Sequence, residues 1–240
     1  MRIGKIGYWL YQPYKYLILV PILIVDTVLF TALTWVFSMI SARLAGKAAV
    51  SWAKVMQWCT PSPVKLVGRE NIVDGQSYVV MANHQGAYDI LAMYGSLPID
   101  FRWVMKKELR DVPLLGFACE LCGHIFIDRS SARASYQSIQ KAKETLTDGV
   151  SVVIFPEGTR SGSRAMRPFK HGGFKMAYDL ELPILPVSIK DTYKVMPGGL
   201  HTLLPGRITL TIHEPIDVSA YEGRREELIA RVRETIDTAL

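Results

Sequence analysis

Apolar runs alternate with segments of mixed polarity along the second part of the chain. The clearest run covers residues 207–213, where every second side chain is apolar, as a half-buried strand requires. Six further runs are short and rich in Val, Ile and Leu, which is typical of strands buried on both faces. The predicted strands are residues 64–67, 78–82, 102–105, 124–127, 150–155, 184–189 and 207–213.

Helical periodicity appears between these runs. In residues 225–240, Leu228, Val232 and Ile236 recur at steps of four, which places them on one helix face. Residues 131–146 and 174–180 are the other predicted helices of this region. Strands interleaved with helices predict an α/β fold, with a mixed, mostly buried sheet flanked by helices.

Residues 17–40 form the longest apolar stretch, and Asp26 is its single charge. As a helix it would be about 36 Å long, enough to cross a bilayer core of about 30 Å. Two features argue against a plain transmembrane span. A charge inside the bilayer is costly, and Pro21 is expected to kink the helix.

The next segment, residues 44–58, has the pattern of a basic amphipathic helix. Arg43, Lys47 and Lys54 share one face, whereas apolar side chains including Trp52 share another. Such a helix is typical of the headgroup layer, although a solvated helix on a globular core has the same pattern. We predict a two-helix membrane-associating motif over residues 1–60 that dips into the bilayer, with a single span as the alternative. Residues 61–63 (Pro-Ser-Pro) then begin the α/β domain, residues 61–240.

Composition limits the classes of protein to which the chain can belong. Of 240 residues, 49% are hydrophobic and 21% charged, which excludes a disordered chain. The net charge of +6 favours anionic partners such as phosphates or a lipid surface, and on charge alone nucleic acid stays open. Three cysteines are too few for a disulfide framework. Cys119 and Cys122 are spaced like half of a zinc site, but no second pair follows, so we interpret them as buried thiols.

Two predicted strands end in polar residues that could carry chemistry. Asn83 and His84 follow the strand at 78–82, and Asp89 lies five residues after His84. Five residues are about 500° of a regular helix. The two side chains can therefore meet only if His84 precedes the helix and Asp89 lies in its first turn. A carboxylate on one imidazole nitrogen would leave the other nitrogen free as a base. A helix-capping role for both residues is the alternative.

The second polar segment is Phe-Pro-Glu-Gly-Thr-Arg-Ser, residues 155–161. Gly158 lets backbone approach a ligand closely, and Arg160 offers a planar fork suited to phosphate. An ordinary turn beside a basic loop is the alternative interpretation of this segment. A third segment, Gly-His-Ile-Phe-Ile-Asp-Arg, ends at Arg129. The sequence lacks a G-x-S-x-G elbow, a phosphate-binding G-x-x-x-x-G-K-[ST] loop and a G-x-G-x-x-G fingerprint.

Together and in this order, these segments resemble the blocks of the glycerolipid acyltransferase family, and most closely the bacterial 1-acyl-sn-glycerol-3-phosphate acyltransferases. The resemblance rests on N-H-x-x-x-x-D at 83–89, G-x-I-F-I-D-R at 123–129, F-P-E-G-T-R-S at 155–161 and an apolar strand with proline at 184–187. A Lys-Lys-Glu-Leu segment at 106–109 fits too, and the likeness covers about residues 60–215. Gly86 departs from the family, whose members often carry Ser there.

The resemblance implies transfer of a fatty acyl group from acyl-CoA or acyl-carrier protein to the sn-2 hydroxyl of lysophosphatidic acid, with no cofactor, metal or nucleic acid. It implies a catalytic base, His84, oriented by Asp89. The residues it implies for substrate binding are Asn83, Lys106, Arg129, Glu157, Gly158, Thr159 and Arg160. It also implies a place on the cytoplasmic face of the inner membrane. An acyltransferase for another lysophospholipid or a lyso-amino-acid lipid, and a non-catalytic lipid-binding protein, are the alternatives.

Overall fold

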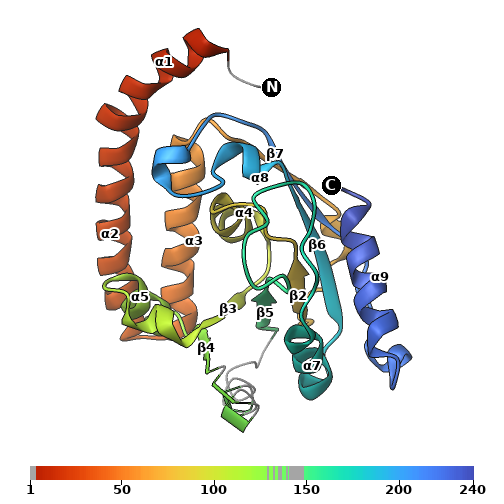
Figure 1. Cartoon of the computed structure of the whole chain (residues 1–240). Coiled ribbons are helices and arrows are strands. Elements are labelled where there is room, and N and C mark those ends of the chain that lie inside the picture. The colour runs from red at the N-terminus through yellow and green to blue at the C-terminus, as the bar shows by residue number, and fades with distance from the viewer. Residues whose placement is uncertain (1–3, 129, 132, 135–136, 139, 141–148) are drawn as a thin grey trace.

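Seven strands form one sheet in the order β1-β7-β6-β2-β5-β3-β4. A computed structural model describes residues 4–128, 130–131, 133–134, 137–138, 140 and 149–240 (Figure 1). Each predicted strand is present, with ends shifted by one residue at most. The strands are β1 (Val64–Val67), β2 (Val79–Ala82), β3 (Phe101–Lys106), β4 (Ile125–Ile127), β5 (Ser151–Ile154), β6 (Ile184–Lys190) and β7 (Ile208–Ile212).

The sheet is mixed, as the sequence predicted. Strands β6, β2, β5, β3 and β4 run parallel to one another, whereas β7 is antiparallel to β6 and parallel to β1. The carboxyl ends of the five parallel strands therefore meet at one edge of the sheet. In α/β sheets, ligands bind at this edge, and the loops after β2 and β5 both begin there.

Helices cover both faces of the sheet. They are α1 (Lys5–Tyr14), α2 (Val20–Ser38), α3 (Ala42–Cys59), α4 (Tyr88–Ser96), α5 (Leu115–Leu121), α7 (His171–Leu180), α8 (Thr192–Val195) and α9 (Arg225–Asp237). Helices α7 and α9 contain the segments predicted at 174–180 and 225–240. Most of the helix predicted at 131–146 lies outside the described residues. The pattern analysis did not predict α5 and α8, because both are short.

Alternate side chains of the central strand β2 enter two different cores. Val79 and Met81 pack with α7 and α9, whereas Val80 and Ala82 pack with α4 and the N-terminal helices. All four are fully buried, which explains why this strand is apolar throughout instead of alternating.

The N-terminal apolar stretch forms a long, largely exposed helical segment. Within the described chain it is the one helix, Ile6–Ser38, that is long and apolar enough to cross a membrane, and 22% of its most apolar window is buried. A π-helical segment (Lys15–Leu19) joins α1 to α2 and ends just before Pro21. Since Pro21 has no N–H, the regular hydrogen-bond ladder cannot continue there. Figure 1 shows the chain changing direction between α1 and α2. This exposed apolar helix indicates membrane association.

Asp26 does not face the outside of this helix. It is 6% exposed, and with Leu23 and Thr34 it belongs to the buried face of α2. That face lies along α3, where the Trp52 Nε1–H donates to Thr27 Oγ1 at 3.2 Å. The charge that argued against a plain span is therefore covered by protein.

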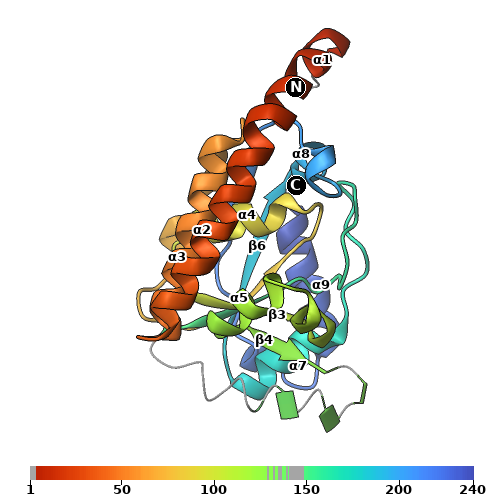
Figure 2. The ribbon, with the colours of Figure 1, turned by 90° about the vertical axis from the view of Figure 1, so that its left-hand side faces the viewer.

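Helix α3 packs between α2 and α4 (Figures 1 and 2). The buried residues of α3 are Ala45, Ala48, Ala53 and Met56, whereas Arg43, Lys47 and Lys54 are exposed. The Gln57 amide donates to the Leu91 carbonyl of α4 at 2.6 Å. The apolar face that the sequence favoured for the headgroup layer is thus largely covered by protein. The apolar surface left for lipid belongs mainly to α1 and α2.

This packing argues that α3 is needed by the α/β domain, although it precedes the predicted boundary at residue 60. We expect a chain of residues 61–240 to lose cooperative thermal unfolding, because α4 would lose its cover of Ala53 and Met56. A chain of residues 42–240, which keeps α3, is the control and should unfold cooperatively in detergent micelles. Circular dichroism decides the question, and equal stability of the two chains would contradict this view.

Candidate active site

His84 and Asp89 meet at the carboxyl end of β2. His84 lies in the loop before α4 and Asp89 in its first turn, as their spacing required. The imidazole Nδ1 is 2.6 Å from Asp89 Oδ2, and the same oxygen accepts the backbone N–H groups of Gln85 at 2.7 Å and Gly86 at 3.0 Å. Asp89 is fully buried. With the Nδ1 proton held by the carboxylate, Nε2 carries the free lone pair.

The segment after β5 holds the His84 loop from the other side. The Phe155 ring stacks on the imidazole, with centroids 4.0 Å apart and planes 6° from parallel. The buried Glu157 carboxylate accepts the backbone N–H of His84 at 2.7 Å through Oε1 and that of Arg167 at 2.7 Å through Oε2. Burial raises the pKa of Glu157 more than these two donors lower it. Both oxygens are engaged by backbone, so Glu157 acts here by joining loops.

Asn83 and Gly86 fix the same loop by different means. The fully buried Asn83 amide donates to the Ile189 carbonyl at 2.8 Å and accepts its N–H at 2.7 Å. This pairing ties β2 to β6 and engages both polar atoms of the side chain. A Cβ on Gly86 would lie 2.6 Å from the Met196 carbonyl oxygen. The departure from the family's Ser is therefore matched by close backbone packing in this chain.

Two positively charged side chains, Arg160 and Lys106, lie near the His84 loop. Arg160 is exposed and donates to the Gly198 carbonyl at 3.0 Å, which holds its guanidinium beside the loop. Gly158 has a φ of 73°, in the left-handed region that favours glycine. Lys106 ends β3 and is exposed. Arg129 lies outside the described residues.

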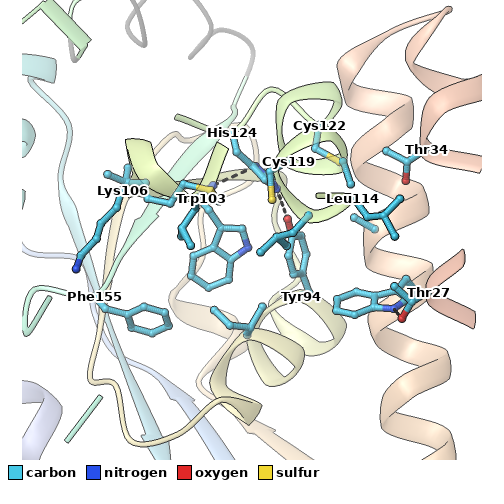
Figure 3. A pocket seen from close by; sticks show the side chains of 18 of the residues that line it. Thr27, Thr34, Tyr94, Trp103, Lys106, Leu114, Cys119, Cys122, His124 and Phe155 are labelled. Atoms are coloured by element: carbon cyan, nitrogen blue, oxygen red, sulfur yellow. Dashed lines mark hydrogen bonds between the residues drawn. The ribbon is translucent and has the colours of Figure 1, made fainter. Parts of the chain in front are cut away.

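An apolar cavity of about 730 Å³ begins at His84 and extends to α2. Figure 3 shows its side chains between Lys106 and Phe155 on one side and Thr27 and Thr34 of α2 on the other. His84, Lys106, Gly158, Thr159 and Arg160 all line it, so the structure gathers five of the predicted residues around one space. The sequence did not predict the cavity, because its wall comes from α2, α3, α4, β3, β5 and α5.

A buried polar pair closes part of this wall. The His124 Nδ1 accepts the Trp103 backbone N–H at 3.3 Å, which leaves its Nε2–H to donate to the Tyr94 hydroxyl. Burial lowers the pKa of His124 to about 3. Burial also raises the pKa of Cys119 to about 11 and of Cys122 to about 12, so both thiols stay protonated at neutral pH. Within the described residues, no three His, Cys, Asp or Glu side chains are grouped closely enough to hold a metal ion.

This arrangement suits proton abstraction from a hydroxyl group. The free Nε2 of His84 is a base held in one orientation by Asp89 and Phe155. Cationic groups beside it suit an anionic head, and the cavity suits an apolar chain. The ligand chemistry that fits all three features is that of an anionic amphiphile.

The chain belongs to the Acyltransferase family, whose sequence profile matches residues 63–190, more than half of the chain. It is also similar to proteins described as 1-acyl-sn-glycerol-3-phosphate acyltransferases. One from Chlamydomonas reinhardtii is 33% identical over 64% of this chain and 46% of its own length. A chloroplastic one from Arabidopsis thaliana is 30% identical over 72% of this chain and 49% of its own. The chain thus spans about half the length of these curated relatives.

A solved structure matches over nearly the whole chain. The crystal structure of the 1-acyl-sn-glycerophosphate acyltransferase from Thermotoga maritima is 30% identical and gives a TM-score of 0.79. The match covers 98% of this chain and 95% of that one, so it includes the N-terminal helices. The α/β fold and the packed pair of N-terminal helices are therefore shared with that protein.

The low pKa of His124 predicts a change of stability with pH. The unfolded pKa is about 6.5, so between pH 6.5 and pH 3 the unfolded chain binds a proton that the folded chain does not. Folding stability should therefore fall with falling pH, by about 1.4 kcal/mol per pH unit from this group. The free energy of unfolding is measured with urea in micelles at several pH values. It should change less steeply with pH in His124→Gln than in the native chain, whereas the exposed control His201→Gln should keep the native pH dependence. The same pH dependence of the free energy of unfolding in His124→Gln and in the native chain would contradict the burial of a neutral His124.

Proposed function

We propose that this protein is a 1-acyl-sn-glycerol-3-phosphate acyltransferase, which makes phosphatidic acid from lysophosphatidic acid and an acyl thioester. The observation that carries the proposal is the His84–Asp89 pair beside an apolar cavity that Lys106 and Arg160 also line. The names of the curated relatives and of the Thermotoga maritima structure support the acceptor. They leave the donor open between coenzyme A and carrier protein.

In the proposed reaction, His84 Nε2 removes the proton from the sn-2 hydroxyl as its oxygen attacks the thioester carbonyl. Asp89 stabilises the resulting imidazolium through Nδ1–H. The carbon–sulfur bond then breaks, an ester bond has formed, and the imidazolium returns its proton to the leaving thiolate. No acyl-enzyme is needed, and the high pKa values of Cys119 and Cys122 disfavour either thiol as a nucleophile.

The acceptor's phosphate would bind beside the loop after β5. Arg160 keeps free guanidinium donors after its bond to Gly198, and no described carboxylate pairs with it. Lys106 lines the same cavity and would add positive field. Gly158 and Thr159 would shape the pocket, and we retain Arg129 as a further phosphate ligand. Glu157 and Asn83 would position these loops without contacting substrate.

The apolar groups of the substrates explain the rest of the cavity and the N-terminal helix. An acyl chain would lie in the cavity between β3, α5 and α2. The exposed apolar α1–α2 segment would hold the enzyme in the membrane where its lipid acceptor lies. Because acyl thioesters of coenzyme A and carrier protein are cytoplasmic, we place the enzyme on the cytoplasmic face of the inner membrane.

A purified-enzyme assay tests the proposal directly. Acyl-CoA and acyl-carrier protein are each combined with lysophosphatidic acid, another lysophospholipid and a lyso-amino-acid lipid. Phosphatidic acid should form fastest from lysophosphatidic acid. Faster turnover of another acceptor would replace the substrate assignment, whereas binding without turnover of any pair would indicate a lipid-binding protein.

His84→Ala should lower kcat by about 10²–10⁴-fold, the usual contribution of general base catalysis. Asp89→Asn should also lower kcat, because an amide does not favour the imidazole tautomer with a free Nε2. Both variants should still float with liposomes, since neither residue belongs to the exposed apolar N-terminal helix. His171→Ala, at an exposed histidine of α7, is the matched control. Near-normal kcat for His84→Ala would exclude His84 as the base.

Arg160→Ala should act on the acceptor and leave the donor unaffected. Loss of a charge-assisted contact to phosphate costs about 1.5–3 kcal/mol, so the acceptor KM should rise roughly tenfold or more. The donor KM should be unchanged, as should both constants for Arg69→Ala, at an exposed arginine before β2. A raised donor KM with a normal acceptor KM would move Arg160 to the donor site.

A further inference from the structure

Lys15 is a buried lysine in the otherwise exposed N-terminal helical segment. It begins the π-helical stretch between α1 and α2, and it is 1% exposed. Its Nζ donates to the His201 carbonyl at 2.8 Å and lies 4.8 Å from the centroid of the Tyr16 ring. Among the described side chains, no carboxylate forms an ion pair with Lys15. A backbone carbonyl and an aromatic ring are therefore what stabilises this ammonium inside the protein.

The burial of Lys15 is costly for a side chain that only fills space. Removing an ammonium from water costs free energy that an apolar side chain of similar length would not cost. The π-helical geometry at Lys15 is also rare, and it is found frequently at functional sites. Both features indicate that the hydrogen bond from Lys15 to His201 has a role beyond packing.

The His201 carbonyl belongs to a short, internally bonded turn, residues 198–202. Thr202 Oγ1 accepts the Gly198 N–H at 3.1 Å and donates to the Gly199 carbonyl at 2.7 Å. The Thr202 backbone N–H donates to the same carbonyl at 2.9 Å. Leu203, which follows the turn, is 1% exposed and belongs to the core. Because these bonds link both ends of the turn, a displacement of the His201 carbonyl would displace the Gly198 carbonyl as well.

The first residue of this turn contacts the candidate active site. Arg160 donates to the Gly198 carbonyl at 3.0 Å, and the Met196 carbonyl just before the turn accepts the Ala87 N–H at 2.8 Å. Figure 1 shows the chain after α8 extending toward the N-terminal helix before it enters β7. Lys15 and Arg160 thus donate to two carbonyl groups of one five-residue turn.

We propose that Lys15 is a positioning residue for the acceptor's phosphate. It fixes the turn at residues 198–202, and the turn holds the Arg160 guanidinium where the phosphate binds. The N-terminal helical segment thus acts on acceptor binding through a contact inside the protein, independently of its exposed apolar surface. Because the assignment of Arg160 to the phosphate belongs to the proposed function, this inference rests on that function.

The link between Lys15 and the turn is measured without catalysis. Hydrogen exchange in micelles, followed by mass spectrometry, reports the Thr202 and Leu203 N–H groups, which are hydrogen-bonded to Gly199 and Leu200. In Lys15→Met, which removes the charge and keeps a side chain of similar length, they should exchange about tenfold faster than in the native chain. Lys47→Met, at an exposed lysine of α3, is the control and should leave this exchange unchanged. Native exchange in Lys15→Met would overturn the link.

Kinetics separate a positioning role from a general loss of structure. Lys15→Met should raise the KM for lysophosphatidic acid about fivefold, as expected for the loss of one supporting hydrogen bond, with kcat and the donor KM within about twofold of the native values. In an Arg160→Ala background, Lys15→Met should change the acceptor KM by less than about twofold, because both residues act through one contact. Lys47→Met should change none of these constants.

A second variant reaches the same turn from its other side. Thr202→Val removes the two side-chain hydrogen bonds that link Thr202 to Gly198 and Gly199. It should raise the acceptor KM as Lys15→Met does and leave kcat and the donor KM near their native values. If Lys15→Met does not fold, Thr202→Val decides by the same criteria.

The outcomes separate this inference from the proposed function. The positioning role is overturned, while the acyltransferase stands, if the acceptor KM is unchanged in Lys15→Met. It is also overturned if that KM rises by the same factor with and without Arg160, or if kcat falls as much as KM rises. If the native chain does not acylate lysophosphatidic acid, the proposed function fails, and hydrogen exchange still decides whether Lys15 fixes the turn.

Discussion

The buried carboxylate of Glu157 is the interaction on which the site depends. It binds one backbone N–H in the loop after β2 and another ten residues further along its own loop. Because β2 and β5 are parallel neighbours in the sheet, their following loops begin side by side. The carboxylate fastens them together, and the stacking of Phe155 on His84 follows from this junction. Removing a carboxylate from water is costly, and two charge-assisted hydrogen bonds offset part of that cost.

Asp89 is a second buried carboxylate that accepts backbone N–H groups, here within a single loop. One oxygen accepts three N–H groups, from the imidazole and from two successive backbone amides. Asp89 Oδ2 therefore both closes the loop that holds His84 and sets the tautomer of the His84 imidazole. Orientation of His84 thus comes from three sides: the carboxylate, the Phe155 ring and the Glu157 bond to its backbone. A base held in this way loses little further freedom when substrate arrives.

Helix α2 links the membrane to the chemistry. Its inner face packs on α3, Thr27 and Thr34 line the cavity, and its outer face is apolar and exposed. The same helix therefore lines the cavity and carries the exposed apolar face that indicates membrane association. Its hydrophobicity alone suggested a span or a hairpin, but the burial of Asp26 shows that one side belongs to the protein.

The sequence by itself determined the strands and the class of fold, and it allowed His84 to meet Asp89, with helix capping as the alternative. Each rests on local periodicity or on a spacing of five residues, which the backbone geometry of one segment decides. The tertiary structure decided the hydrogen-bond partners of these polar groups: the side chains of Asn83 and Glu157, predicted to bind substrate, form hydrogen bonds with backbone groups 106 and 73 residues away. The tertiary structure also forms the cavity, because residues from α2 and β5 line it together. It buries the apolar face of α3 in the protein core. Only packing between distant segments settles such contacts, because an apolar face has the same sequence pattern whether lipid or protein covers it.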